Sequence, residues 1–135
     1  MAADTDNEAM YDLYEYRGDA LTTEAGSGPT VLFSHGHMMD RTMFRPQLDA
    51  LSDDYHVVAY DYPARTDHWK GPYDLDDLIE CCRHLIEGMG TDSVVLGGMS
   101  MGGYMAQEFA AKYPDMVEAL ILIDTTSEAL SEEEQ

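Results

Sequence analysis

The chain has 135 residues, enough for one compact domain, and 44% of them are hydrophobic, which allows a buried core. Its formal net charge is −20, with 27 acidic residues against 7 Lys and Arg, and no basic stripe is present to neutralise phosphates, which disfavours nucleic-acid binding. No apolar run reaches the roughly 18 residues that span a bilayer, and the first residues lack the basic and apolar regions of a signal peptide, so we expect a cytoplasmic protein without a membrane partner.

Three segments are predicted along the chain. Residues 1–8 and 127–135 show no apolar periodicity, and we expect a disordered lead and an acidic tail there. Residues 9–126 are predicted to form one domain, because no internal repeat or linker interrupts them. At its start, alternating side chains over residues 10–17 predict a strand, and residues 21–23 are its expected hairpin partner.

Strands and helices alternate in the rest of this domain. Continuous apolar runs predict buried strands at residues 30–34, 56–60, 93–96 and 119–123. Helical periodicity predicts helices over Phe44, Leu48 and Leu51, from Asp74 to Met89, and from Tyr104 to Tyr113. This order favours an α/β fold, with a mostly parallel sheet, helices on both faces and ligands at the carboxyl ends of the strands.

The two cysteines, Cys81 and Cys82, are neighbours in the second predicted helix. Adjacent side chains on a helix point about 100° apart, so we expect two buried, reduced thiols rather than a disulfide. No Cys and His spacing typical of a metal site is present, and we expect no metal or organic cofactor.

The pentapeptide Gly98-Met99-Ser100-Met101-Gly102 has the pattern G-x-S-x-G, between a predicted strand and a predicted helix. In that position the serine lies on a sharp turn that exposes its hydroxyl, which indicates a nucleophile. A phosphate-binding loop is excluded, because Gly103 and Tyr104 stand where Lys and Ser or Thr would be needed. A dinucleotide site is excluded as well, since no G-x-G-x-x-G is present.

A second turn, Ser34-His35-Gly36-His37-Met38, directly follows a buried strand. A glycine there lets the backbone turn so that the next amide faces the nucleophile and serves as an oxyanion donor beside the amide of Met101. We interpret His35 as a structural histidine that holds this loop, because the general base is expected from another strand end.

These motifs resemble those of the α/β-hydrolase family, in its esterase, enol-lactonase and cofactor-free haloperoxidase branch. The matching segments are residues 31–36, 58–61, 94–103, 113–114 and 119–124. The resemblance implies that Ser100 is the nucleophile and that the backbone amides of Met101 and His37 form the oxyanion hole. It also implies an α/β-hydrolase domain over residues 9–126 that hydrolyses a small carboxylic ester or lactone through an acyl-serine intermediate.

Two departures from the family pattern stand out. The turn after the predicted strand at 56–60 reads Asp61-Tyr62-Pro63-Ala64-Arg65-Thr66 and lacks the Arg-Gly-x-Gly that is common there. The triad order is Ser, then Asp or Glu, then His, yet His84 is the last histidine of this chain. We therefore expect a fold that is incomplete at its carboxyl side, after the strand that ends at Asp124. For Asp124 a structural role is favoured over that of the catalytic acid.

No histidine follows Ser100 to serve as the general base, and this leaves alternatives open. The other histidines, His35, His37, His56, His68 and His84, are each favoured as surface or structural residues. The chain is then either an inactive fragment or one half of a two-chain hydrolase, and an exposed sheet edge would favour a carboxyl-terminal half or a homo-oligomer as partner. With peroxide as acyl acceptor, the same site would run perhydrolase or halogenating chemistry. Methionines 99, 101 and 105 surround the predicted turn at Ser100, here called the elbow, and core packing is favoured for Met105.

The charge generates the first testable prediction. Only two of the basic residues are lysines, Lys70 and Lys112, which argues against heat adaptation and favours a halophilic protein over an ordinary acidic one. Because salt screens the mutual repulsion of the carboxylates, the melting temperature should be higher in molar KCl than at low salt. Thermal melts followed by circular dichroism test this, and equal stability in both solutions would contradict it.

Overall fold

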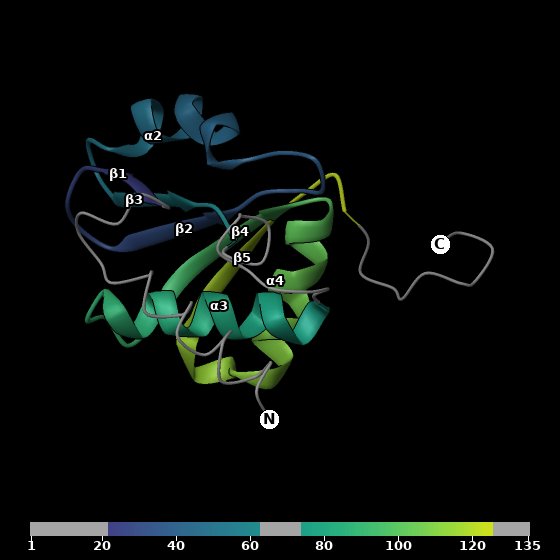
Figure 1. Ribbon diagram of the computed structural model, residues 1–135. Helices are drawn as coiled ribbons and strands as arrows, with labels where there is room; N and C mark the ends of the chain where they lie inside the picture. Colours follow the sequence, from purple (N-terminus) through teal and green to yellow (C-terminus); the bar gives the residue numbers. More distant parts are fainter. Residues whose placement is uncertain (1–21, 63–73, 126–135) are drawn as a thin grey trace.

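The computed structural model describes residues 22–62 and 74–125, which build a five-stranded sheet of order β1-β3-β2-β4-β5 (Figure 1). Its strands are β1 (Thr22–Ala25), β2 (Thr30–Ser34), β3 (His56–Tyr60), β4 (Val94–Met99) and β5 (Val117–Ile123). Strands β3, β2, β4 and β5 run parallel, and β1 is antiparallel to β3. The predicted, mostly parallel α/β sheet is confirmed.

Helices cover both faces of this sheet, as predicted. They are the 3-10 helix η2 (Arg41–Phe44), α2 (Arg45–Leu51), α3 (Leu75–Gly88), α4 (Met101–Lys112) and the 3-10 helix η4 (Pro114–Met116). In Figure 1, α2 lies on one side of the sheet and α3 and α4 lie on the other. The carboxyl ends of β2 and β4 therefore meet between two helical layers.

The strand predictions differ from the structure mainly at their ends. Strands β2 and β3 have the predicted bounds, whereas β4 begins one residue later and extends to Met99, and β5 begins two residues earlier. Strand β1 starts within the predicted hairpin arm at 21–23 and pairs with β3. The other arm, at 10–17, and the segments 1–8 and 127–135 lie outside the described residues.

Successive side chains along each strand point to opposite faces of the sheet and enter two separate apolar cores. On one face, Leu32, Val58 and Leu96 pack among residues of α3 and α4. On the other face, Phe33 stacks on Phe44, with ring centroids 4.9 Å apart. Because both faces are covered, the central positions of β2 and β3 are continuously apolar, the pattern typical of buried parallel strands.

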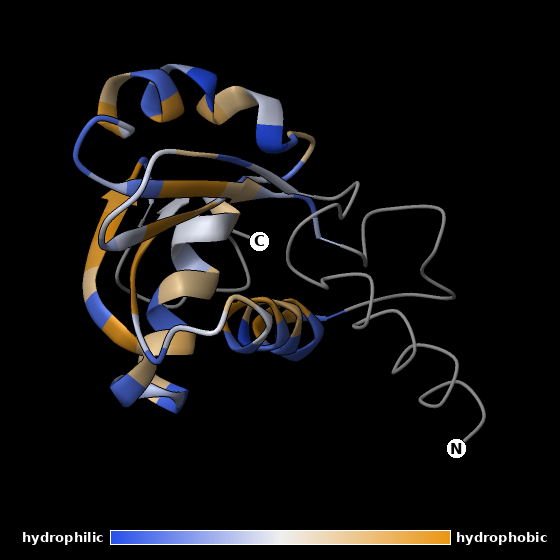
Figure 2. Ribbon diagram, turned by 90° about the vertical axis from the view of Figure 1, so that its left-hand side faces the viewer, coloured by the Kyte–Doolittle hydropathy of each residue, from blue (hydrophilic) through white to orange (hydrophobic). Residues whose placement is uncertain are grey.

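Helix α3 begins with a capping box. The Asp74 side chain accepts a hydrogen bond from the amide of Asp77, and the Asp77 side chain accepts one from the amide of Asp74. Seen end-on in Figure 2, α3 turns its hydrophobic residues toward α4 and the sheet. Cys81 and Cys82 are buried on that side and form no disulfide, which confirms the prediction, and burial raises the pKa of the Cys82 thiol to about 12.

Strand β5 has apolar side chains that remain accessible. Within the described residues it pairs with β4 alone, so it is an edge of the sheet. Leu120, Ile121 and Leu122 keep 37%, 36% and 44% of their surface exposed. An apolar edge strand of this kind is open to pairing with another polypeptide segment. None of the helices within residues 22–62 and 74–125 is long and apolar enough to cross a membrane.

A polar cluster joins α3 to the end of α4. The Glu80 carboxylate accepts hydrogen bonds from the Tyr113 hydroxyl (2.6 Å), Arg83 Nε (2.6 Å) and Lys112 Nζ (3.0 Å). Burial raises the pKa of Glu80, but the hydrogen bonds from these three groups outweigh it and hold the pKa at about 2, below the ordinary 4.5. The ionised carboxylate therefore stabilises the contact between the two helices.

Replacing Glu80 should show this stabilisation and its pH dependence. Because the folded-state pKa is depressed, the stabilisation is present above about pH 4.5 and is lost as the pH falls toward about 2. Glu80→Gln should lower the free energy of unfolding by about 1 kcal/mol at pH 7, after discounting for solvent screening, and the difference should shrink at acidic pH.

Urea unfolding of both proteins across this pH range measures the difference. The matched control is Glu87→Gln, which removes another carboxylate bound to Arg83 but one that is more than half exposed. Equal losses in the two variants would contradict a special role for Glu80.

Candidate active site

The turn at Ser100 joins β4 to α4 in an unusual backbone conformation. Ser100 has φ 52° and ψ −113°, in the left-handed half of backbone space that side chains other than glycine rarely adopt. Its amide donates to the carbonyl of Ile123 (2.9 Å). Its carbonyl accepts from the amide of Tyr104 (3.0 Å) and from the Thr125 hydroxyl (2.9 Å). These bonds hold the strained turn in place.

Two glycines of the pentapeptide are required by close approach of the backbone. A Cβ on Gly98 would lie 2.2 Å from the carbonyl oxygen of Gly102. A Cβ on Gly102 would lie 2.3 Å from the carbonyl oxygen of Ser34, at the end of β2. The sharp turn and the packing of α4 against β2 therefore exclude any side chain at these positions.

Ser100 is exposed, and its hydroxyl takes no part in capping. Ser100 occupies the N-cap position of α4, yet its side chain makes no capping hydrogen bond. Met101, the first residue of α4, contributes an amide at the amino end of a 12-residue helix. The partial positive charge of that helix end favours an anionic oxygen beside Ser100.

The loop of residues 36–40, here called the oxyanion loop after the role predicted for the His37 amide, passes directly against this turn. A Cβ on Gly36 would lie 3.1 Å from the Met99 carbonyl and 3.4 Å from Ser100 Cβ. His37 follows and is exposed, and Met38, with φ 62°, is 79% exposed. The structure thus brings the three predicted site residues, Ser100, Met101 and His37, to the same end of the sheet.

The histidines are distributed over the fold. His35 is buried and hydrogen-bonds the carbonyl of Gly36 through Nδ1 (2.8 Å), which fits a role in holding the loop. His56 lies at the opposite end of its strand from the elbow, and His84 lies within α3. His68 lies outside the described residues. Among the described histidines, none hydrogen-bonds the Ser100 hydroxyl.

Asp124 lies next to the elbow. The residues just before Ser100 and Asp124, which are Met99 and Ile123, are partners across β4 and β5. It is exposed and has φ 47°. Its position is compatible with both roles that the sequence leaves open, a structural aspartate and a catalytic acid. No group of three or more His, Cys, Asp or Glu that could hold a metal occurs within residues 22–62 and 74–125.

The methionines near the elbow have different environments. Met105 is fully buried in the core between α4 and the sheet, as predicted. Met99 and Met101 are half-buried, each packed against a different core. Met39, which the sequence analysis did not single out, places its sulfur 3.3 Å from a Cβ built on Gly36. An apolar side chain of the oxyanion loop therefore packs back against Gly36.

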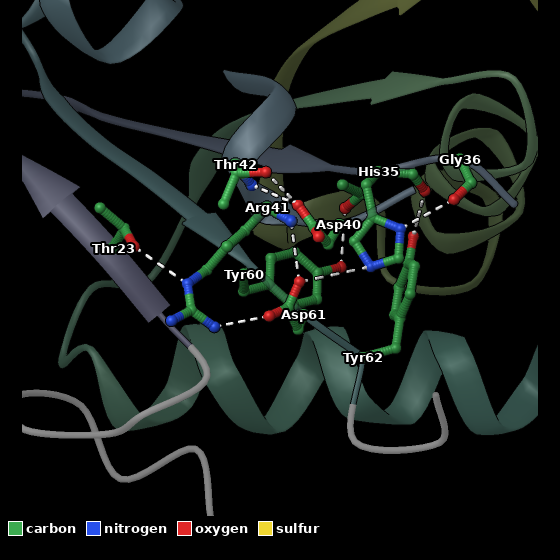
Figure 3. Close-up of polar contacts among 10 residues, drawn as sticks. Thr23, His35, Gly36, Asp40, Arg41, Thr42, Tyr60, Asp61 and Tyr62 are labelled. Carbon is green, nitrogen blue, oxygen red and sulfur yellow. Dashed lines mark hydrogen bonds and ion pairs between the residues drawn. The ribbon is translucent and has the colours of Figure 1, made fainter. Parts of the chain in front are cut away.

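Sequence analysis also missed the polar groups that support this loop. Asp61 receives hydrogen bonds from the backbone amide of Arg41 (2.8 Å) and from its guanidinium (2.5 Å), and it faces His35 (Figure 3). Arg41 Nε also donates to the Thr23 hydroxyl (3.0 Å). The one sequence signal was the position of Asp61, directly after a buried strand.

Comparisons with known proteins agree with this geometry. A sequence profile described as alpha/beta hydrolase fold matches residues 29–135. The chain is 33% identical to 2-(acetamidomethylene)succinate hydrolase of Mesorhizobium japonicum, over 76% of this chain and 38% of that protein. It is 32% identical to pimeloyl-[acyl-carrier protein] methyl ester esterase of Pseudoalteromonas atlantica, over 78% of this chain and 40% of that protein.

Solved structures show the same relationship. An esterase from Thermogutta terrifontis superposes with a TM-score of 0.77 and 36% identity, over 83% of this chain and 42% of that chain. An epoxide hydrolase from Bacillus megaterium superposes with a TM-score of 0.71 and 32% identity, over 77% of this chain and 38% of that chain. The chain spans less than half the length of each of these proteins. With its elbow, its parallel sheet and its matched profile, the chain belongs to the α/β-hydrolase family.

Proposed function

We propose that this chain carries the nucleophile and oxyanion hole of a serine hydrolase acting on a small carboxylic ester or lactone. The observation that supports it is the exposed Ser100 on a strained strand-to-helix turn, with the oxyanion loop against it. Ser100 Oγ attacks the carbonyl carbon, and the amides of Met101 and His37 donate to the oxygen that becomes negative. The alcohol leaves, and water then releases the acid from the acyl-serine.

The chemistry of an oxyanion hole favours an ester over an epoxide. Relatives of both kinds occur among the similar proteins, as the esterase of Thermogutta terrifontis and the epoxide hydrolase of Bacillus megaterium illustrate. Amide donors beside Ser100 stabilise the oxyanion of a tetrahedral carbonyl adduct. An epoxide has no carbonyl carbon and forms no such adduct, so acyl transfer is the reaction that this arrangement fits.

A general base is the remaining requirement, because a serine hydroxyl is a weak nucleophile until a neighbouring base accepts its proton. We propose that the base, a histidine, comes from outside the described residues. The exposed apolar strand β5 offers the surface on which further polypeptide, a carboxyl-terminal half or a second copy, would pack. A second candidate follows from the same observation: without that polypeptide, the chain is a folded but inactive fragment.

Labelling with a fluorophosphonate, together with turnover of p-nitrophenyl acetate, tests the assignment of the nucleophile. Ser100→Ala should abolish labelling and lower turnover at least about 100-fold, because no other group replaces the attacking oxygen. The matched control is Ser93→Ala, a serine that hydrogen-bonds Glu118 and should be dispensable.

Unchanged labelling and turnover in Ser100→Ala would show that another residue is the nucleophile. A wild-type chain that is folded but unlabelled would instead favour the inactive fragment. Addition of a carboxyl-terminal half that supplies the histidine should then restore labelling at Ser100.

A further inference from the structure

We propose that Asp61 is a positioning residue that fixes both ends of the oxyanion loop and thereby sets the place of the His37 amide. This inference rests on the proposed function, because the loop matters for catalysis only if its amide serves the oxyanion. Asp61 follows β3 and does not touch the Ser100 turn in any described contact. Its influence would act through the two residues that flank the loop, His35 and Arg41.

The amino-terminal end of the loop is held through His35. Since a carbonyl only accepts, Nδ1 carries the proton that is donated to Gly36. Nε2 lies 3.9 Å from Asp61 Oδ1, so the carboxylate pairs with the ring when the imidazole is protonated at both nitrogens (Figure 3). The Tyr62 hydroxyl donates to the His35 carbonyl (3.3 Å), and its ring packs edge-on to the imidazole, with centroids 4.6 Å apart. His35 is 1% exposed, so its ring has little freedom to move.

The carboxyl-terminal end of the loop is held through Arg41. The same oxygen that faces His35, Asp61 Oδ1, accepts the backbone amide of Arg41, and Oδ2 accepts its guanidinium. The guanidinium is also tied to Thr23 on β1. Two hydrogen bonds to one carboxylate fix both the backbone and the side chain of Arg41. Figure 3 shows Asp61 between Arg41 and His35.

One carboxylate, directly after β3, therefore contacts the residues at both ends of the loop. Inside the loop, the Met39 amide donates to the Gly36 carbonyl (3.3 Å), and Met38 adopts a left-handed φ. A strained turn of this kind keeps its shape only when its surroundings hold it. His37 lies in this turn, two residues from His35, so the distance from its amide to Ser100 depends on the anchored ends.

This role predicts a specific kinetic signature. An oxyanion donor acts on the charge that develops in the transition state and contributes little to binding of the neutral ester. Loosening the loop should therefore lower kcat and leave KM nearly unchanged. A residue that only supported the stability of η2 would instead change the melting temperature, without lowering kcat selectively over KM.

The test compares Asp61→Asn with Arg41→Ala, and uses Arg45→Ala as the matched control. Arg45 lies in the next turn of chain and is paired only with the exposed Asp49 in the described contacts. Backbone ¹⁵N order parameters of residues 36–40 should fall from about 0.85 to below about 0.6 in the first two variants and stay unchanged in the control. Turnover of p-nitrophenyl acetate should show a kcat about 10- to 100-fold lower, with KM within about 2-fold.

Unchanged order parameters in a folded Asp61→Asn and in Arg41→Ala would overturn the proposal, as would an equal effect in Arg45→Ala. The two hypotheses remain distinguishable. If Ser100→Ala retains full labelling and turnover, the proposed function fails. The order parameters still decide whether Asp61 anchors the loop.

Discussion

The left-handed turn at Ser100 is the constraint on which the rest of the site depends. It requires a strand that delivers the chain to the carboxyl edge of the sheet, and a helix that leaves at once with its amino end beside the serine. It also requires the absence of side chains where α4 crosses the ends of β2 and β4, which the pentapeptide glycines provide. Because the Ser100 amide is bound to Ile123, the strain is held by the neighbouring strand rather than by the loop itself.

The sequence was sufficient to predict the sheet and the strand-to-helix turn at Ser100, because both depend on local patterns. Strands β2 and β3 are buried on both faces, so apolar runs mark their bounds. The start of β5 was missed, because η4 at 114–116 leads straight into Val117 without a turn residue to mark the boundary. The elbow combined a motif with strand-to-helix context, which made it recognisable.

The contacts of Asp61 that hold the oxyanion loop could not be predicted from the sequence, for a physical reason. Arg41 and Asp61 are 20 residues apart and meet only because β1, β2 and β3 pair in one particular register. Polar contacts of this range leave no periodic trace in the chain, unlike an amphipathic helix. Each Lys and Arg within residues 22–62 and 74–125 pairs with a carboxylate, although acids greatly outnumber them. The contacts of Arg41 and Lys112 join separate elements, so the few cations stabilise tertiary structure.

Strand β5 connects the exposed edge of the sheet to the turn at Ser100. Its last residue, Ile123, accepts the hydrogen bond from Ser100, and Thr125 just beyond it binds the Ser100 carbonyl. Exposed edge strands open more readily than central ones, because fewer apolar contacts oppose their separation. Polypeptide packed on Leu120, Ile121 and Leu122 would therefore do more than cover an apolar surface. By fixing β5, it would also fix the hydrogen bonds that hold the Ser100 turn in its strained conformation.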